Sequence, residues 1–391
     1  MNYDEIYNLE STYASGAVGR RPVAIVRARG ATLWDSEGRA YIDCASAHGW
    51  ANVGHSHPTV TAAIQAQADT LVAQPESAYN DVRAQWMQEL AAVLQTSLGW
   101  ETCAIHPSNS GTEAIEAAIK LARLLTGRRG LVAARRGFHG RTLGSLSLTW
   151  NKKYRQPFEP LVAGVEHIPY NSIEAAEAAI GDETAAVVVE IVQGEGGVFP
   201  GETEYFQALR RLCTERGALL VVDEIQTGVG RTGRWLACEH HRLSPDVVTL
   251  GKSIGGGVPM GVTAWRGELG RFKAGTHGST FGGNPLACAA SRAVLQVMAE
   301  ERLPERAARL GDRLMAGLRA IPSDQVREVR GLGLMVGVEL RGKVTPVLQA
   351  LMDRGVWALP AGMNVLRLLP PLVISEAELD RVVEAVGETL R

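Results

Sequence analysis

The sequence predicts an α/β protein in which a large domain holds a mostly parallel central sheet and a smaller α+β domain follows. Three apolar runs between Val187 and Gly257 predict this sheet, and each ends in polar residues and glycines: AVVVEIVQGEGG, ALLVVDEIQTGVGRTG and DVVTLGKSIGGG. Short continuous apolar runs bounded by glycine are typical of buried parallel strands. A chain of 391 residues also exceeds the size at which a single core keeps growing, which indicates two domains.

The polar ends of these runs carry the candidate chemistry. α/β sheets bind ligands outside the carboxyl ends of their strands, so we expect Glu190, Asp223 and Lys252 to meet in one crevice. A lysine that bonds to an aldehyde and a carboxylate that keeps a pyridine nitrogen protonated are what pyridoxal 5′-phosphate (PLP) requires. A Walker phosphate loop fits poorly, because its lysine follows the glycines, whereas Lys252 precedes Gly255. Solvated strand ends are the plainer alternative, but three glycine-rich ends in series argue against it.

Composition excludes several other classes of protein. The net charge of −2, with Lys and Arg dispersed along the chain, lacks the basic domain that nucleic-acid binding needs. Five widely separated cysteines without a CxxC pair indicate neither a disulfide framework nor a zinc ribbon, and suit a reducing cytoplasm. The start MNYDEIYNLE is not a signal peptide, and no apolar run is long enough for a membrane span. We therefore expect a cytoplasmic protein without nucleic-acid or membrane partners.

The first hundred residues predict a small antiparallel sheet followed by two helices. Alternating residues around two turn signals, Arg29-Gly30 and Glu37-Gly38, favour the sheet. The helices are expected from Pro58 to about residue 72 and from about residue 80 to Leu98. His55 and His57 form an HxH pair that could suggest a metal, but no third ligand is spaced to join them, so helix capping or packing is favoured and no metal is expected.

A second helix start is a candidate anion site. Residues 109–112 (NSGT) open a helix with an apolar face, and Ser and Thr at such a position usually only cap the helix. A helix N-terminus also offers free amides to a phosphate. A strand is then expected at residues 130–134, before the glycine-rich loop GFHGRT.

The rest of the chain supplies crossover helices and the small domain. We expect helices at about residues 171–180 and 203–216, the latter ended by Gly217 in a left-handed conformation. After Cys288 the composition changes: one long helix leads into EERLPER, and three short strands and further helices follow, the last beginning at Ser375. The predicted domains are an N-terminal segment (1–50) that packs with the small domain, a large PLP-binding domain (51–288) and a C-terminal small domain (289–391).

Two motifs, DEIQTGVGRTG and TLGKSIGGGVPMG, resemble those of the class III aminotransferases of the acetylornithine and ornithine type, and the resemblance extends over essentially the whole chain. It implies the PLP-dependent transferase fold type I. It also implies that Lys252 holds the cofactor and later acts as a base, and that Asp223 pairs with the pyridine nitrogen. Decarboxylases and racemases of the same fold are the close alternatives. A scaffold without activity would predict a damaged lysine, aspartate or phosphate site, and none is damaged.

The resemblance further implies a set of binding residues. In it, Phe138 stacks on the cofactor ring, Gln226 contacts its phenolic oxygen, and Thr280 reaches the phosphate in the neighbouring subunit of a homodimer with shared sites. The implied cofactor-binding residues are Ser110, Gly111, Thr112, Phe138, Glu190, Asp223, Glu224, Ile225, Gln226, Lys252 and Thr280. The implied substrate-binding residues are Arg141, Glu195, Ser279 and Arg367.

The implied substrates are 2-oxoglutarate or glutamate and an ω-amino compound. Arg367 would bind the α-carboxylate of 2-oxoglutarate or glutamate. Glu195 would pair with Arg367 when the ω-amino compound is bound. Three stretches, RLLPPLVI, RGLGLMVGVEL and SLSLTWNKKYRQPFEP, resemble members that act in lysine biosynthesis on aminoadipate semialdehyde attached to a small acidic amino-group carrier protein. Acetylornithine, in arginine biosynthesis, is the alternative substrate. The chain departs from relatives at Val18, where a substrate-facing Tyr is common, and in EIVQGEGG, which lacks the usual Pro.

Overall fold

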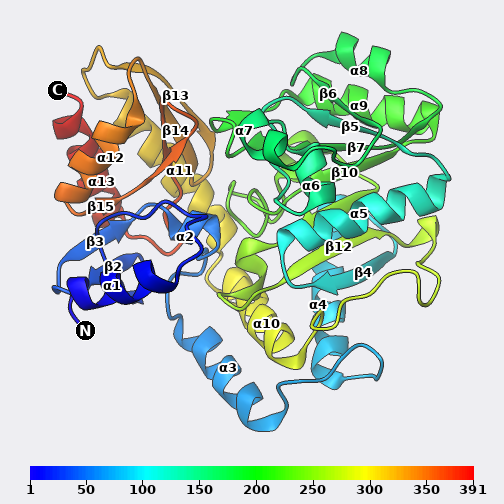
Figure 1. The fold of residues 1–391 in the computed structure, drawn as a ribbon, viewed down its shortest axis with the longest axis horizontal. Helices are drawn as coiled ribbons and strands as arrows, with labels where there is room; N and C mark the ends of the chain where they lie inside the picture. The colour runs from blue at the N-terminus through cyan, green and yellow to red at the C-terminus, as the bar shows by residue number, and fades with distance from the viewer.

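The computed structural model describes residues 1–391, and its largest element is a seven-stranded sheet (Figure 1). The strand order across this sheet is β4-β12-β11-β10-β7-β5-β6. All neighbouring strands from β11 to β6 run parallel, and β12 runs antiparallel to both of its neighbours. The strands are β4 (Cys103–Ser108), β5 (Gly130–Ala134), β6 (Val165–Ile168), β7 (Thr184–Glu190), β10 (Leu219–Asp223), β11 (Val247–Leu250) and β12 (Gly261–Arg266).

The three apolar runs that predicted the sheet are β7, β10 and β11, and they are neighbours in its middle. Every residue of these strands is buried. That explains why their sequences are continuously apolar, since both faces of a parallel sheet are covered. The predicted mostly parallel sheet is therefore confirmed.

Helices cover the two faces of this sheet. α5 packs across five of the strands, and α9 packs on β10 and β7. α5 begins with Ser110 as its N-cap and ends at Gly127 in the left-handed conformation. α9 ends at Gly217 with φ 65°, as predicted. The helices next to the sheet are α4 (Asp81–Leu98), α5 (Gly111–Thr126), α6 (Leu143–Leu148), α7 (Lys152–Arg155), α8 (Ile173–Ala179) and α9 (Thr203–Arg216).

The two ends of the chain lie together on one side of the molecule, blue and red in Figure 1. The N-terminal sheet has the order β1-β2-β3-β15, so a strand from the C-terminal part pairs with it. The expectation of three C-terminal strands is wrong: four form a sheet in the order β13-β14-β17-β16 and β15 joins β3. The strands are β1 (Ile25–Arg29), β2 (Thr32–Asp35), β3 (Ala40–Asp43), β13 (Val326–Leu332), β14 (Met335–Leu340), β15 (Val356–Trp357), β16 (Leu359–Ala361) and β17 (Val365–Leu368). Two short strands, β8 (Val192–Gln193) and β9 (Phe199–Pro200), form a separate pair.

The long helix expected after residue 288 is broken in two. α10 (Pro285–Glu300) and α11 (Leu303–Arg319) are separated at Arg302, whose φ is 50°. Pro304 lies in the first turn of α11 and has no amide to continue a helix from α10. α10 packs against α3 and α4 of the large domain, so we propose the break at Arg302, rather than residue 288, as the domain boundary.

The remaining helices include the predicted α3, which begins at Pro58 with His57 as its N-cap. The His57 side chain also contacts Glu301 (Nε2 to Oε1, 3.0 Å), and His55 contacts Asp43 (Nε2 to Oδ2, 2.7 Å). His57 therefore caps α3, and His55 pairs with Asp43. These helices are α1 (Tyr3–Tyr13), α2 (Ser46–Gly49), α3 (Pro58–Thr70), α12 (Val344–Asp353) and α13 (Glu376–Thr389).

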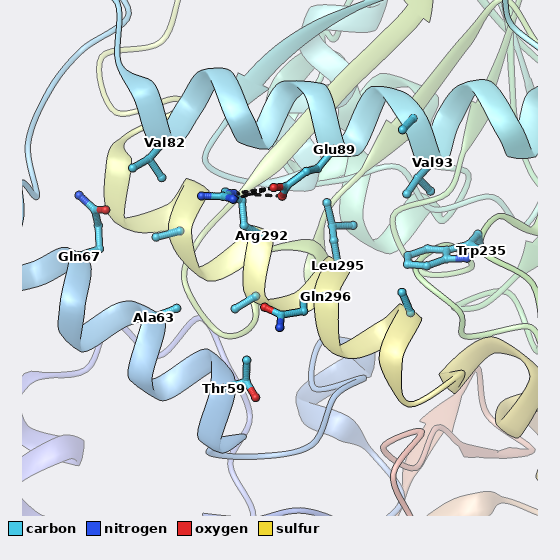
Figure 2. A pocket seen from close by; sticks show the side chains of 14 residues that line it. Thr59, Ala63, Gln67, Val82, Glu89, Val93, Trp235, Arg292, Leu295 and Gln296 are labelled. Carbon is cyan, nitrogen blue, oxygen red and sulfur yellow. Dashed lines mark hydrogen bonds and ion pairs between the residues drawn. The ribbon is translucent and has the colours of Figure 1, made fainter.

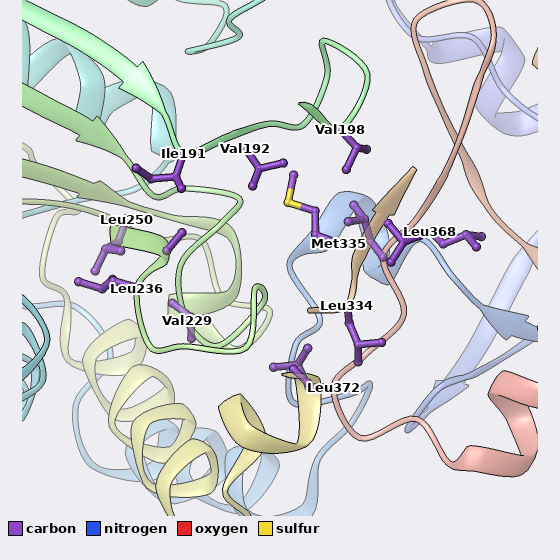
Figure 3. Close-up of a cluster of buried hydrophobic side chains, with 14 of the residues drawn as sticks. Ile191, Val192, Val198, Val229, Leu236, Leu250, Leu334, Met335, Leu368 and Leu372 are labelled. Carbon is purple, nitrogen blue, oxygen red and sulfur yellow. The ribbon is translucent and has the colours of Figure 1, made fainter. Parts of the chain in front are cut away.

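A single apolar cluster joins the central sheet to the C-terminal strands. Figure 3 shows Ile191 and Leu250 on the sheet side and Leu334 and Leu368 on the other, with Val198 and Met335 between them. All six side chains are buried. The two parts therefore share a core and hold each other in place. None of the helices combines the length and apolar character that a membrane crossing needs.

A groove of about 600 Å³ lies between α3, α4 and α10 (Figure 2). Its lining is mostly apolar, and the Arg292 guanidinium crosses it to the Glu89 carboxylate at 2.7 Å. The groove lies on the helices and contains none of the strand-end residues.

The contact between α11 and the β13–β14 turn gives a stability prediction. A Cβ on Gly311 would lie 2.1 Å from the backbone oxygen of Gly333. Gly311→Ala should therefore lower the free energy of unfolding by about 2 kcal/mol or more, although alanine favours helix by about 1 kcal/mol. Gly387→Ala in α13 is the matched control, because its Cβ would meet only ordinary contacts at 3.7 Å or more. Chemical denaturation should show a loss for the first variant and none for the second.

Candidate active site

The carboxyl ends of β7, β10 and β11 open into one cavity of about 240 Å³. Glu190 and Asp223 are the last residues of neighbouring strands and lie directly beside each other in register. Lys252 follows β11 by two residues. The predicted convergence of these three residues is confirmed. The cavity is lined by Gly111, Thr112, Phe138, His139, Gly140, Arg141, Glu190, Glu195, Asp223, Ile225, Gln226 and Lys252.

Lys252 lies in a strained backbone position. Its φ is 47°, in the left-handed region that costs a non-glycine residue on the order of 1–2 kcal/mol. Burial lowers the pKa of the Lys252 amine, and the carboxylates of Asp223, Glu195 and Glu190 offset part of that effect. A lysine with a lowered pKa is more often present as the free amine, which is the form that reacts with aldehydes.

Asp223 is held by three neighbours, one of which is the Thr249 hydroxyl, which donates to its Oδ1 at 3.4 Å. Its Oδ2 lies 2.7 Å from Nδ1 of His139, and its Oδ1 accepts a hydrogen bond from the Ile225 amide at 3.0 Å. Burial alone would lower the pKa of His139, but the hydrogen bond and charge of Asp223 outweigh it and raise that pKa. Sequence reasoning missed His139, although its place next to Phe138 in the loop GFHGRT was a usable signal.

Glu190 holds two loops rather than standing free in the cavity. Its carboxylate accepts hydrogen bonds from the backbone amides of Phe138 (3.0 Å) and Gly194 (3.3 Å). The pKa of Glu190 is raised to about 7, mainly by burial. The charge of His139 lowers this pKa, and the charge of Asp223 raises it. Glu190 therefore positions the loops that bring Phe138 and Glu195 to the cavity.

The start of α5 forms one wall of the cavity through close backbone approaches. A Cβ on Gly111 would lie 2.8 Å from Cγ2 of Ile225, and one on Gly140 would lie 2.3 Å from Oγ1 of Thr112. The first amides of a helix have no intrahelical acceptor, so those of Gly111 and Thr112 are available to a ligand in this wall. Ser110 caps the helix through its side chain, which accepts from the Glu113 amide, and does not line the cavity.

Arg367 lies behind the cavity and is 1% exposed. Its Nη1 donates to Oε1 of Glu195 at 2.6 Å and to Oε1 of Gln226 at 3.3 Å, while its Nε has no partner. Burial would raise the pKa of Glu195, but Arg367 and Lys252 outweigh it and lower that pKa. The Glu195 side chain is 34% exposed, whereas that of Arg367 is almost completely buried.

Arg141 and Phe138 form the outer wall. The Arg141 guanidinium lies over the Tyr154 ring at 3.7 Å from its centroid and 5.7 Å from that of Phe138. The Tyr154 and Phe138 rings meet edge to face at 6.2 Å. This stack fixes an exposed cation at the entrance of the cavity.

Besides Ser110 and Arg367, three of the residues named from the sequence do not line this cavity. Glu224 is buried against Thr227 and accepts from the Cys238 amide at 2.9 Å. Ser279 and Thr280 line a second cavity of about 420 Å³. Within one chain these three residues are therefore outside the strand-end site.

Comparison with known proteins identifies the class. The family model of the class-III aminotransferases matches residues 13–390, and the chain belongs to this family. It is therefore a PLP-dependent aminotransferase with the fold type I of that class.

Individual relatives cover the chain almost completely. It is 48% identical over 385 residues to the LysW-aminoadipate semialdehyde transaminase of Deinococcus radiodurans, covering 97% of this chain and 89% of that one. It is 43% identical over 387 residues to an acetylornithine aminotransferase of Methanosarcina mazei, covering 99% and 96%. An ornithine aminotransferase from Toxoplasma gondii, with PLP at partial occupancy in its active site, superposes with a TM-score of 0.94 at 32% identity, covering 100% and 94%.

The raised pKa of Glu190 predicts how stability depends on pH. The folded state binds a proton at Glu190 up to about pH 7, whereas an unfolded glutamate loses it near pH 4.5. The contribution of Glu190 to the free energy of unfolding is therefore complete below about pH 4.5 and is lost as the pH rises through about 7. Unfolding free energies measured across this window should fall more for the wild-type apoenzyme than for Glu190→Gln. Parallel curves for the two proteins would contradict the assignment.

Proposed function

We propose that the cavity at the ends of β7, β10 and β11 is the PLP site. The residues present fit the group: an amine, a fixed carboxylate and a helix N-terminus surround one cavity, and glycines leave its wall open. When bound, PLP supplies an aldehyde for the amino group and a protonated ring that withdraws electrons. Lys252 would hold the cofactor and carry a proton, Asp223 would hold the proton on the ring nitrogen, and Gly111 and Thr112 would bind the phosphate. Phe138, Ile225 and Gln226 would contact the ring.

We further propose that the enzyme moves an ω-amino group between carrier-linked lysine/aminoadipate semialdehyde and 2-oxoglutarate/glutamate. The pair of Arg367 and Glu195 supports the use of two differently charged substrates in one site. A buried cation can bind a substrate carboxylate when its own carboxylate partner moves away, and can pair with that partner when the other substrate is bound. The relative from Deinococcus radiodurans is named for LysW-aminoadipate semialdehyde. This name supports a carrier-linked substrate. The acetylornithine aminotransferases among the relatives support acetylornithine as the second candidate.

The proposed assembly is a homodimer with shared sites in the cytoplasm. Thr280 is exposed in a polar turn away from its own strand-end cavity, which suits a residue that reaches a neighbouring subunit. The apolar groove in Figure 2 and the fully exposed Tyr79 and 70% exposed Phe281 offer surfaces that a second copy would bury. Five free cysteines suit a reducing compartment.

The experiment that tests the substrate is a screen of single half-reactions. Purified holoenzyme is mixed with lysine attached through its α-amino group to the carrier, with acetylornithine, or with free ornithine and lysine, and cofactor absorbance is followed. Preference for the carrier-linked lysine would support the first candidate. Preference for acetylornithine would select the second, and no reaction with any ω-amino donor would exclude both.

The role of Lys252 gives a direct prediction. Borohydride reduction of the wild-type holoenzyme should fix the cofactor on the peptide that contains Lys252. Lys252→Ala should fold normally and lose transamination by several orders of magnitude, about tenfold for each 1.4 kcal/mol added to the barrier. Peptide mapping that found the label on another lysine would reject the assignment.

The switch between substrates gives a second prediction. Glu195→Ala should slow the ω-amino donor half-reaction by about 10- to 100-fold, because Arg367 then stays open to α-carboxylates, and should leave the 2-oxoglutarate half-reaction nearly unchanged. Glu195→Gln, which keeps the shape of the side chain, is the control. If the pair were only a structural ion pair, Glu195→Ala would lower the melting temperature and slow both half-reactions equally. Stopped-flow measurements of each half-reaction beside a melting curve distinguish these results.

A further inference from the structure

Glu195 lies in a short turn that joins the two strands of the β8–β9 hairpin. The turn runs from Gly194 to Val198 and contains three glycines. Val198 has φ 54°, a left-handed conformation that is a clear outlier for a β-branched residue. Such strain persists only where the surrounding structure holds the backbone, and it concentrates at functional sites. The turn that carries Glu195 therefore needs support from outside the hairpin.

The C-terminal sheet presents one row of residues to this turn. Arg330 of β13 lies opposite Gly337 of β14, and Gly337 lies opposite Arg367 of β17. Residues directly opposite each other in antiparallel strands project from the same face of the sheet. Because each strand spacing is about 5 Å, the Cα atoms of the two arginines are about 10 Å apart. Between them the row has a position without a side chain.

The turn meets this row at one end and in the middle. Glu195 pairs with Arg367 through Oε1 and Nη1 at 2.6 Å. Val198 is fully buried (Figure 3) and lies over the middle of the row, since a Cβ on Gly337 would be 2.9 Å from the Cβ of Val198. The missing side chain of Gly337 is therefore the space that the turn occupies.

Arg330 holds the other end of the turn through backbone carbonyls. Its Nε donates to the oxygens of Gly197 and Val198, both at 3.1 Å, and its Nη2 donates to that of Gly197 at 2.7 Å. The guanidinium also lies 3.8 Å from the centroid of the Phe199 ring. These contacts use the planar fork of donors that arginine has and lysine lacks.

Arg330 is itself held in place. Its side chain is 7% exposed, and its Nη1 donates to Oε2 of Glu339 and to Oε2 of Glu328, each at 2.6 Å. On the opposite side of the turn, the Gly194 amide donates to Glu190 at 3.3 Å. The backbone is thus anchored on both sides of Glu195.

We propose that Arg330 and Gly337 are positioning residues for the pair of Glu195 and Arg367. Arg330 fixes the backbone of the turn and Gly337 leaves room for it, so that the Glu195 carboxylate reaches Arg367 when no substrate carboxylate is bound there. The C-terminal sheet then supplies both the cation and the anchor of the carboxylate that competes for this cation. This inference rests on the proposed use of one site by two substrates and adds the residues that set the balance between them.

The first test is Gly337→Ala, which leaves both arginines in place. Two carbons cannot stay at 2.9 Å, so the turn should shift and Glu195 should lose part of its contact with Arg367. The donor is whichever of carrier-linked lysine, acetylornithine, ornithine and lysine the wild type prefers. Its half-reaction should slow about 3- to 10-fold, while that of 2-oxoglutarate stays within about twofold. Gly342→Ala is the matched control, because nothing lies within 4 Å of its added Cβ.

The second test is Arg330→Lys, which keeps a positive charge beside Glu339 but cannot reproduce the fork that binds the turn. It should show the same selective loss in the donor half-reaction. Arg327→Gln is its matched control, because Arg327 pairs with the same Glu339 at 3.1 Å and makes no hydrogen bond to the turn. If one variant fails to fold, the other still decides the outcome.

A double-mutant cycle separates positioning from a general effect on stability. Adding either variant to Glu195→Ala should slow neither half-reaction further, because the carboxylate that the two residues position is gone. Equal slowing of both half-reactions by the single variants, a full additional loss in the Glu195→Ala background, or the same loss in the controls would overturn the proposal.

The outcome for Glu195→Ala distinguishes this inference from the proposed function. If Glu195→Ala slows only the donor half-reaction and the Gly337 and Arg330 variants do not, the positioning role is refuted and the proposed function stands. If Glu195→Ala slows both half-reactions equally, or no ω-amino donor reacts with the wild type, the proposed function itself is refuted.

Discussion

The structure depends on placing several charged groups together at the ends of three buried strands. Glu190, Asp223 and Lys252 cannot be solvated there as they would be in water, so each requires partners supplied by the fold. His139 pairs with Asp223, and the Phe138 and Gly194 amides bind Glu190. The result is a site in which the pKa of the buried Lys252 amine is lowered and the Asp223 carboxylate is held by His139. Gly111 and Gly140 contribute to this site because they let neighbouring segments approach more closely than a side chain would allow.

The site also depends on the contact between the large domain and the C-terminal sheet. Arg367 belongs to β17 of the C-terminal sheet, whereas Glu195 belongs to the loop after β8. The shared apolar core holds these two elements against each other (Figure 3), and the ion pair between Arg367 and Glu195 spans the contact. Arg330 strengthens this contact, because its guanidinium donates to the backbone oxygens of Gly197 and Val198 and pairs with Glu339. The geometry of the Arg367–Glu195 ion pair therefore depends on how the two parts of the chain pack.

The sequence alone determined the parallel strands, the helix caps and the residues at the strand ends, because apolar runs, glycines and capping residues act over a few positions. It also indicated Lys252 and Asp223 as a pair, since their residue types suit one cofactor. Tertiary structure decided what depends on distant segments: His139 as the partner of Asp223, Glu190 as an anchor of two loops, and β15 as part of the N-terminal sheet. The position of Ser279 and Thr280 outside their own chain's cavity was likewise visible only in three dimensions. Such contacts join residues far apart in the chain, and no local pattern specifies which of them will meet.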